Sequence, residues 1–284
     1  MKKISNVQTD LERAFYGSQD TEFEYINISG PADGESSFKE CHNISIKNSN
    51  FYLRYPFWHN DKLTMNSSCL YTGCRAAFWY CNDVNISSTF SYGIKGFREC
   101  QNIQMKNCSF QSEEIFWRCN NIIIDGGYID GEYAFFQSNN IQIKQLQFKG
   151  KYSFQYVNNA HMKYTYFQTK DAFWHSKDIT VEDSTIEGEY LGWYSENLTL
   201  IRCRIIGTQP LCYCKNLRLI DCTFERCDLA FENSEVNGNI IGGIDSIKNP
   251  LKGTLEIQNE PVFIKDEFYK GNGQFVLKVK KENS

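Results

Sequence analysis

The sequence predicts an all-β fold, a right-handed parallel β-helix of about eleven 19-residue coils with capped ends. Three observations support this prediction. A short motif recurs at a fixed spacing, its apolar positions alternate with the two-residue period of a strand, and each repeat holds three short apolar segments. A single coil cannot bury its own apolar side chains, so neighbouring coils are expected to stack and share one core.

An aliphatic position defines the repeat and recurs every 19 residues, apart from one step of 21 between Leu63 and Val84. A second aliphatic column lies two positions later, which is strand periodicity. Ile26 and Ile28 suggest a further degenerate coil upstream. The first column consists of Ile44, Leu63, Val84, Ile103, Ile122, Ile141, Ala160, Ile179, Leu198, Leu217 and Val236.

Two further apolar columns complete each coil. The third column is Phe51, Leu70, Phe110, Ile129, Phe148, Phe167, Ile186, Ile205 and Phe224. The fourth is Phe38, Phe57, Phe78, Phe97, Phe116, Phe135, Phe154 and Phe173, relaxing to Gly192, Leu211 and Ala230. A left-handed hexapeptide helix would favour a period of 18 with six-residue subrepeats, so the period of 19 favours right-handed winding.

Polar columns also repeat. The position before the first aliphatic column is Asn or Asp from Asn43 to Asn216, with Lys62 as an exception. Stacked amides can form a ladder of hydrogen bonds, and Asn tolerates a left-handed bend. Most of the twelve cysteines share columns with serines. We interpret these cysteines as small, partly buried structural residues.

The ends of the chain depart from the repeat. We predict an N-terminal cap over residues 1–22, in which Thr9 to Gly17 form a short capped helix or turn. The β-helix domain is expected over residues 23–244, and residues 245–284 are expected to form a C-terminal cap of separate strands. Insertions at residues 30–36 and 71–75 lie either at a binding face or in plain turns.

Composition excludes several classes of function. The 284 residues carry a net charge of −4, so no basic surplus is available for nucleic acid or for an anionic membrane. No apolar run resembles a secretion signal or a membrane span, so we expect a cytoplasmic protein with reduced thiols. The cysteines form no CxxC pair and only four histidines occur, so we expect no metal and no cofactor.

The position after the phenylalanine column is rich in tryptophan. Neighbouring residues of a strand face opposite sides, so either the phenylalanine or the tryptophan column must lie outside. The tryptophan column also holds polar residues, so we place it outside. A bend of the chain is expected just beyond it. Exposed indoles beside titratable groups are typical of a saccharide-binding groove, whereas a subunit contact or a stripe covered by the C-terminal tail is the alternative. The candidate ligand-binding residues are Lys39, Trp58, Trp79, Arg98, Trp117, Trp174, His175 and Trp193.

Catalytic candidates come from the column beside the tryptophans. Glu40 with His59, and Glu99 with Arg118, are neighbours one coil apart that could pair. Glycoside hydrolysis needs two carboxylates at a set separation, and a lyase needs converging acids with a basic residue. The sequence therefore leaves open whether the protein is an enzyme. Arg202, Arg204 and Asp221 lie close in sequence but at scattered column positions.

Four motifs carry a resemblance to a known family: Gly30-Pro-Ala-Asp-Gly-Glu-Ser36, Arg54-Tyr-Pro-Phe-Trp-His59, Gly207-Thr-Gln-Pro-Leu-Cys-Tyr-Cys-Lys-Asn-Leu217 and Asp245-Ser-Ile-Lys-Asn-Pro250. Over nearly its whole length the chain resembles a bacterial family of uncharacterised pectin-lyase-like repeat proteins. The resemblance implies a right-handed parallel β-helix in a cytosolic protein and carries no established activity. The wider superfamily includes pectate lyases and polygalacturonases, but counterparts of their catalytic clusters are missing here.

These observations predict a β-helix scaffold that binds a carbohydrate-like ligand or a protein partner, a second copy included, along an aromatic face. The alternative is a polysaccharide lyase or glycoside hydrolase that acts in the same groove.

Overall fold

A computed structural model describes residues 1–29 and 36–280, and in these residues it contains 26 strands and no helix. The chain divides into two compact units, residues 1–147 and residues 148–284. Each unit is a parallel β-solenoid, which confirms the predicted fold class. Of the insertion at residues 30–36, only Ser36 lies within the described residues.

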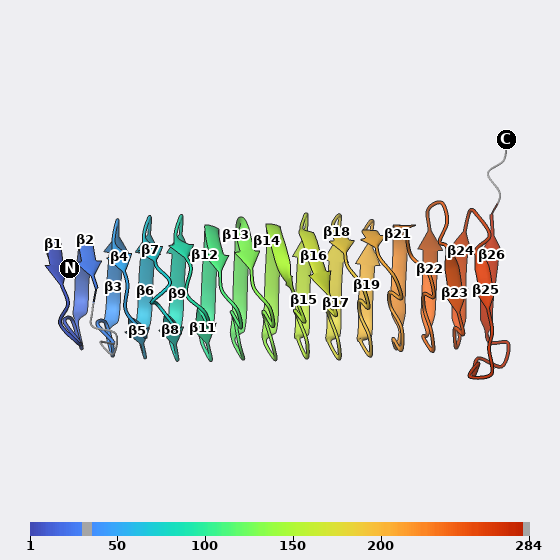
Figure 1. Ribbon diagram of the computed structural model, residues 1–284, viewed down its shortest axis with the longest axis horizontal. Coiled ribbons are helices and arrows are strands. Elements are labelled where there is room, and N and C mark those ends of the chain that lie inside the picture. Colours follow the sequence, from blue (N-terminus) through green and yellow to red (C-terminus); the bar gives the residue numbers. More distant parts are fainter. Residues whose placement is uncertain (30–35, 281–284) are drawn as a thin grey trace. The chain divides into compact units, whose positions relative to one another are not determined.

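Long and short strands make up the coils of the first unit (Figure 1). The long strands are β1 (Lys2–Thr9), β2 (Gln19–Ile28), β3 (His42–Lys47), β6 (Asp61–Asn66), β9 (Asn82–Ser87), β12 (Gln101–Gln111) and β13 (Asn120–Asp130). The short strands are β4 (Asn50–Phe51), β5 (Phe57–Trp58), β7 (Cys69–Leu70), β8 (Phe78–Trp79), β10 (Phe90–Ser91) and β11 (Phe97–Arg98). Strand β14 (Asn139–Lys151) begins in this unit.

The predicted register is confirmed in the first unit. Leu63 pairs with Ile44 on one side and with Val84 on the other, so the step of 21 residues is accommodated without a shift of the strand. The position of the upstream coil was wrong: Ile28 pairs with Phe51, and it is Thr21 and Phe23 that pair with Ile44 and Ile46. The four-residue lengthening around residues 30–36 caused this error, because it displaces the motif from its 19-residue spacing.

The second unit contains strands of the same kinds. They are β15 (Asn158–Lys163), β16 (Tyr166–Lys170), β17 (Lys177–Glu182), β18 (Thr185–Glu187), β19 (Glu196–Ile201), β20 (Arg204–Ile206), β21 (Leu217–Glu225), β22 (Val236–Ile240), β23 (Ser246–Lys248), β24 (Gly253–Ile257), β25 (Val262–Ile264) and β26 (Phe275–Val279). All pairings between them are parallel, with one register shift between Leu219 and Cys222.

The number of coils exceeds the prediction. The two units contain about 14 turns, against about eleven expected. Strand β1 stacks in parallel on β2, where the sequence placed an N-terminal cap, and residues 12–17 form a turn rather than a helix. At the other end, β24 and β26 continue the parallel pairing from β22. Irregular coil lengths hide these rungs from a search for a constant period.

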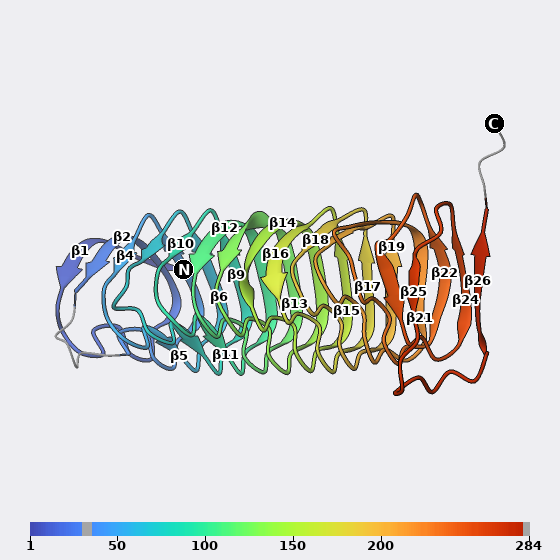
Figure 2. The same cartoon turned by 45° about the vertical axis from the view of Figure 1, so that its right-hand side comes forward.

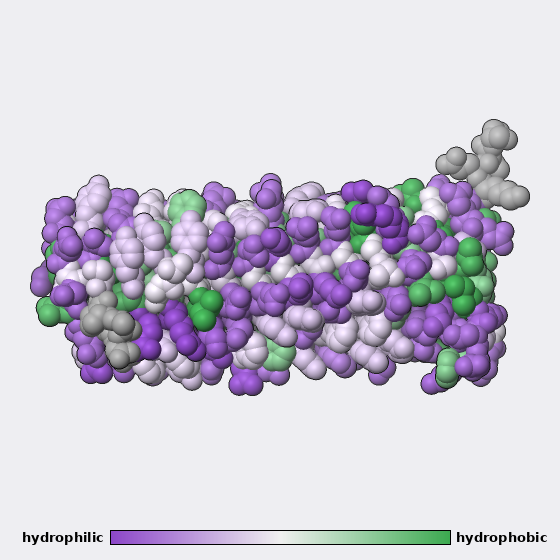
Figure 3. Space-filling model, in the orientation of Figure 1, coloured by the Kyte–Doolittle hydropathy of each residue, from purple (hydrophilic) through white to green (hydrophobic). Residues whose placement is uncertain are grey.

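The apolar columns form the core. The first two aliphatic columns are buried in both units. In the first unit, the rings of the phenylalanine column from Phe38 to Phe135 follow one another at centroid distances of 4.5 to 5.4 Å. In the second unit, Phe154 and Phe173 stack in the same way at 5.3 Å. The face in Figure 3 is mainly hydrophilic or pale, with small scattered apolar patches, as expected when these columns point inward.

The amide ladder is confirmed in each unit. Asn140 donates to Asn121 and Asn121 to Asn102 at 3.1 and 2.9 Å, and in the second unit Asn216 donates to Asn197 at 2.8 Å. The backbone of this column is left-handed, with φ between +51° and +60°. The same residue type therefore satisfies the bend and links neighbouring coils.

The cysteines occupy the structural positions that were predicted. All twelve are free; Cys69 is half-buried and the other eleven are buried. The backbone N–H groups of Cys81 and Cys100 each donate to the sulfur of the cysteine one coil later, and the N–H of Cys119 donates to Ser138 Oγ at 2.9 Å. Cysteine and serine interchange in this column because either side chain can accept this bond.

Candidate functional site

The site is built on one corner of the coil, where β5, β8 and β11 pair in parallel at one edge of the first unit (Figure 2). Phe57, Phe78 and Phe97 are completely buried, and the residues that follow them are half-buried at the surface. This confirms that phenylalanine lies inside and tryptophan outside. The next residue in each coil has a left-handed backbone, such as His59 with φ +56°, which is the bend expected there.

We define the first aromatic face as these two outward columns of the first unit. The half-buried column is Lys39, Trp58, Trp79, Arg98, Trp117 and Phe136. The corner column is Glu40, His59, Tyr80, Glu99, Arg118 and Gln137.

Neighbouring side chains cover the ring faces of this column. Lys39 Nζ lies 4.4 Å from the ring centroid of Trp58, and the rings of Trp58 and Trp79 stack at 5.5 Å with 13° between their planes. Arg98 lies 5.2 Å from the ring of Trp117, which also stacks on Phe136 at 4.3 Å. The rings therefore present mainly their edges to solvent.

The indole N–H groups of Trp58 and Trp79 are buried and have no hydrogen-bond acceptor among the described residues. The ring of Tyr55 lies 6.0 and 5.9 Å from the two indole rings. An unsatisfied buried donor is costly, so ring packing rather than hydrogen bonding holds these two indoles in place.

Of the four catalytic candidates, the structure pairs only Glu40 and His59, whose Oε1 and Nδ1 atoms are 3.2 Å apart. The expected pairing of Glu99 with Arg118 is absent in the described residues. Arg118 Nε instead donates to Gln137 Oε1 at 2.9 Å, and the Glu99 carboxylate has no ion pair or hydrogen bond with any described side chain.

The separation of the two carboxylates bears on hydrolysis. Glu40 and Glu99 lie three coils apart in one column, which places their backbones about 14 Å from each other at about 4.8 Å per coil. Glycosidases hold their two carboxyl groups roughly 5 to 9.5 Å apart. The backbone separation exceeds this range, so the two carboxyl groups would meet it only if both side chains leaned toward each other.

The second unit carries its own aromatic face, formed by Trp174 and Trp193 beside a stack of rings that are exposed except for half-buried Tyr213. The two indoles stack at 5.5 Å, and their N–H groups donate to the carbonyl oxygens of Tyr190 and Gln209 at 2.7 and 3.0 Å. His175 lies between two tyrosine rings at about 5 Å on each side, and the stack consists of Tyr156, His175, Tyr194 and Tyr213. The sequence analysis did not include these tyrosines in the site, although their 19-residue spacing in line with His175 was the available signal.

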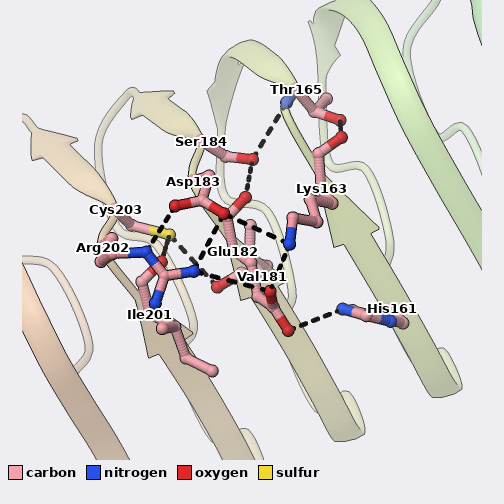
Figure 4. A network of polar contacts seen from close by, with 10 residues as sticks. All are labelled: His161, Lys163, Thr165, Val181, Glu182, Asp183, Ser184, Ile201, Arg202 and Cys203. Carbon is pink, nitrogen blue, oxygen red and sulfur yellow. Dashed lines mark hydrogen bonds and ion pairs between the residues drawn. The ribbon is translucent and has the colours of Figure 1, made fainter.

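A network of charges spans three strands of the second unit (Figure 4). Glu182 contacts His161 at 3.0 Å and Lys163 at 3.1 Å, while Arg202 binds both oxygens of Asp183 at 2.6 and 2.9 Å. Arg202 lowers the pKa of Asp183 by hydrogen bonding, and Lys163 lowers the pKa of Glu182 in the same way. The network ties neighbouring coils together.

A shallow pocket of about 270 Å³ borders this network and includes Arg202, Arg204 and Asp221. Each of these charges already has a partner: Asp183 for Arg202, Glu225 for Arg204, and the amide of Asn239 for Asp221. The residues that the sequence analysis found scattered are therefore held in structural contacts, two ion pairs and one hydrogen bond, rather than in a converging site.

No group of three or more His, Cys, Asp or Glu side chains within residues 1–29 and 36–280 is arranged to hold a metal ion. Across the same residues, the structure contains no helix with the length and hydrophobicity needed to cross a membrane.

Fold and surface together define a parallel β-solenoid that carries stacked aromatic columns on its outside. Comparison with known families assigns it further. The chain belongs to the family described as a protein of unknown function (DUF3737), which matches residues 2–277. This confirms the family resemblance. A search of curated proteins found no match.

Solved structures with a similar fold include a GH136 lacto-N-biosidase from Eubacterium ramulus, at 9% identity and a TM-score of 0.33. The alignment covers 93% of this chain and 62% of that one. A periplasmic alginate epimerase AlgG double mutant is similar at 10% identity and a TM-score of 0.29, covering 92% of this chain and 76% of the other. At these values the likeness concerns the fold and is no guide to activity.

Proposed function

We propose that this protein is a non-catalytic β-solenoid scaffold in the cytoplasm, and that its first aromatic face binds a protein partner. The observation that carries the proposal is the stacking of that face: its rings turn their faces to one another and their edges outward. The carbohydrate-like ligand expected from the sequence is the competing occupant of the same surface.

The stacking of the rings distinguishes between the two candidate occupants, a protein partner and a carbohydrate-like ligand. A sugar packs its apolar face against the flat face of an aromatic ring. In the first aromatic face, both sides of Trp58 and of Trp117 are covered by residues of this chain. Protein interfaces use Trp, Tyr and Arg in any orientation that packs closely, so the stacking favours a protein surface over a sugar.

Exposed polar groups on the same face support a protein partner. Tyr80 is 42% exposed, so its hydroxyl group is available to a partner. Arg118 is exposed and is bonded only to a neutral amide, while Glu99 has no charged partner among the described residues. Charges free to pair with a partner, beside aromatic rings that a partner would bury, are the combination that gives protein interfaces their specificity.

Carboxylate spacing supports the absence of catalysis. The distance of about 14 Å between the backbones of Glu40 and Glu99 leaves Glu40 and His59 as an isolated pair. A lyase or hydrolase acting on this face is the alternative, and it predicts release of reducing sugar or unsaturated product from acidic polysaccharides.

A comparison of three proteins tests the proposal: the wild type, Tyr80→Asp, and Ile123→Asp as a matched control. Ile123 is 44% exposed on β13, outside the aromatic face. Each is used to capture proteins from the source cell by cross-linking, and each is also applied to a glycan array. We expect the wild type and Ile123→Asp to retain the same protein partner and Tyr80→Asp to lose it. Glycan binding that quenches tryptophan fluorescence and is lost in Trp79→Ala, or turnover of a polysaccharide, would overturn the proposal.

A further inference from the structure

We infer that the partner of the first aromatic face is a second copy of this chain, bound antiparallel about a two-fold axis between the Arg98 coil and the Trp117 coil. This inference rests on the proposed function, because it names the protein that occupies the same face. It comes from the order of residues along the two columns.

An antiparallel two-fold axis places each column opposite itself with the coil order reversed. The coil of Arg98 and Glu99 then faces the coil of Trp117 and Arg118 of the other copy. The coil of Tyr80 likewise faces the coil of Gln137. Neighbouring coils lie about 4.8 Å apart in both copies, so the two series remain in step over these four coils.

The charges match in this arrangement. Glu99 of each copy meets Arg118 of the other, so two ion pairs form about one axis. Within one chain these groups do not pair, because Arg118 turns to Gln137 at 2.9 Å and leaves Glu99 alone. Glu99 and Arg118 are the only neighbouring residues of opposite formal charge in the corner column between Glu40 and Gln137.

The half-buried column matches as well. Arg98 of one copy lies opposite the outward edge of Trp117 of the other, whose two ring faces are covered by Arg98 and Phe136 of its own chain, so this pair contributes packing and no new cation–π contact. Trp79 faces Phe136, so an aromatic pair forms on each side of the axis. A parallel two-fold axis that runs through the corner column would instead set Glu99 on Glu99 and Arg118 on Arg118, which repulsion disfavours.

Charge exchange tests the inference. Sedimentation equilibrium is measured over a wide concentration range for the wild type, Glu99→Arg, Arg118→Glu and the double variant, with circular dichroism to confirm folding. We expect a wild-type dimer, a dissociation constant raised at least about tenfold in either single variant, and recovery to within about threefold in the double variant. Glu196→Arg makes the same charge change in the second unit, which contributes no residue to the first aromatic face, and is expected to leave the dimer intact.

Cross-linking tests the direction of pairing. In a Cys69→Ser background, Tyr80→Cys and Gln137→Cys proteins are oxidised separately and as a mixture. The proposed axis brings residue 80 opposite residue 137, so we expect the covalent dimer in the mixture and not in either protein alone. Covalent dimers of Tyr80→Cys with itself would overturn the antiparallel arrangement.

The outcomes separate this inference from the proposed function. A wild-type protein that is monomeric at every concentration, or a dimer that ignores the charge variants, overturns the two-fold dimer. If Tyr80→Asp nevertheless loses a captured protein of a different sequence, the proposed function stands and only the identity of the partner was wrong. If Tyr80→Asp retains all captured proteins and the dimer is also insensitive, both fail.

Discussion

Phe116 allows the cost of the left-handed backbone in the core to be measured. This ring is completely buried and stacks on Phe97 and Phe135 at 4.9 and 4.7 Å, while its φ is +58°. Replacing it by Ala removes the ring and should cost about 3 to 5 kcal/mol. Replacing it by Gly removes the ring as well, but it also relieves the left-handed strain, which is worth about 1 to 2 kcal/mol. The extra backbone entropy of Gly in the unfolded chain offsets about 0.5 to 1 kcal/mol of this gain.

Phe97 provides the matched control. It is equally buried in the same column and stacks on rings at both sides, but it lies in β11 and has no positive φ. There Gly should be less stable than Ala by about 0.5 to 1 kcal/mol, whereas at Phe116 Gly should equal or exceed Ala. The lost ring cancels when Gly is compared with Ala at one site, and the glycine entropy cancels when the two sites are compared. The preference for Gly over Ala should therefore be larger at Phe116 than at Phe97 by about 1 to 2 kcal/mol.

Urea unfolding of the four variants, followed by far-ultraviolet circular dichroism, supplies these free energies where the transitions share one slope. Coils of a solenoid can unfold separately, so variants are compared within each site before the two sites are compared. The same preference for Ala over Gly at both positions would show that φ at Phe116 carries no strain and would refute the reasoning.

Three further predictions concern the thiols, a glycine and the charge network. Burial raises the pKa of Cys74 and Cys214 to about 12, so their thiolate fraction at pH 8 falls about a thousandfold. Because eleven of the twelve thiols are buried, a thiol reagent should react rapidly with the native protein only at half-buried Cys69; rapid reaction of several thiols without denaturant would contradict this. Gly127→Ala should lower the free energy of unfolding by more than about 3 kcal/mol, because the added Cβ would lie 2.2 Å from the carbonyl oxygen of Cys108. Gly17→Ala should cost about 1 kcal/mol, because its Cβ would have nothing within 4 Å. Similar melting temperatures for the two variants would argue against close backbone packing at Gly127. Arg202 lowers the pKa of Asp183 by hydrogen bonding. Their pairing therefore stabilises the fold above the unfolded pKa of about 4, and this contribution is lost as the pH falls through the lowered pKa of the folded state. The difference in unfolding free energy between wild type and Arg202→Ala should shrink in acid, and a difference that is constant with pH would exclude the ion pair as its cause.

The part of the site that could be read from the sequence is its location. The alternation of buried Phe57 with half-buried Trp58 follows from strand geometry, and the pairing of Glu40 with His59 follows from their spacing. The partner of Arg118 could not be read in this way, because Glu99 and Gln137 are each one coil from it and only the side-chain conformation selects between them. The strands expected near the C-terminus are present, but their continued stacking could not be read from a constant spacing. The coils from β22 to β24 and from β24 to β26 step by 17 and 22 residues, as in Gly238 to Leu255 and Leu255 to Leu277.

The sequence by itself determined that the chain winds into stacked parallel coils, because a constant period places identical residue types in line and only stacking buries them. It also determined which columns point inward, since alternation along a strand leaves no other choice. Only the tertiary structure decided what the tryptophans offer to a partner. Whether a ring presents its face or its edge depends on the residues one coil before and one coil after it, and that contact exists only once the coils are stacked.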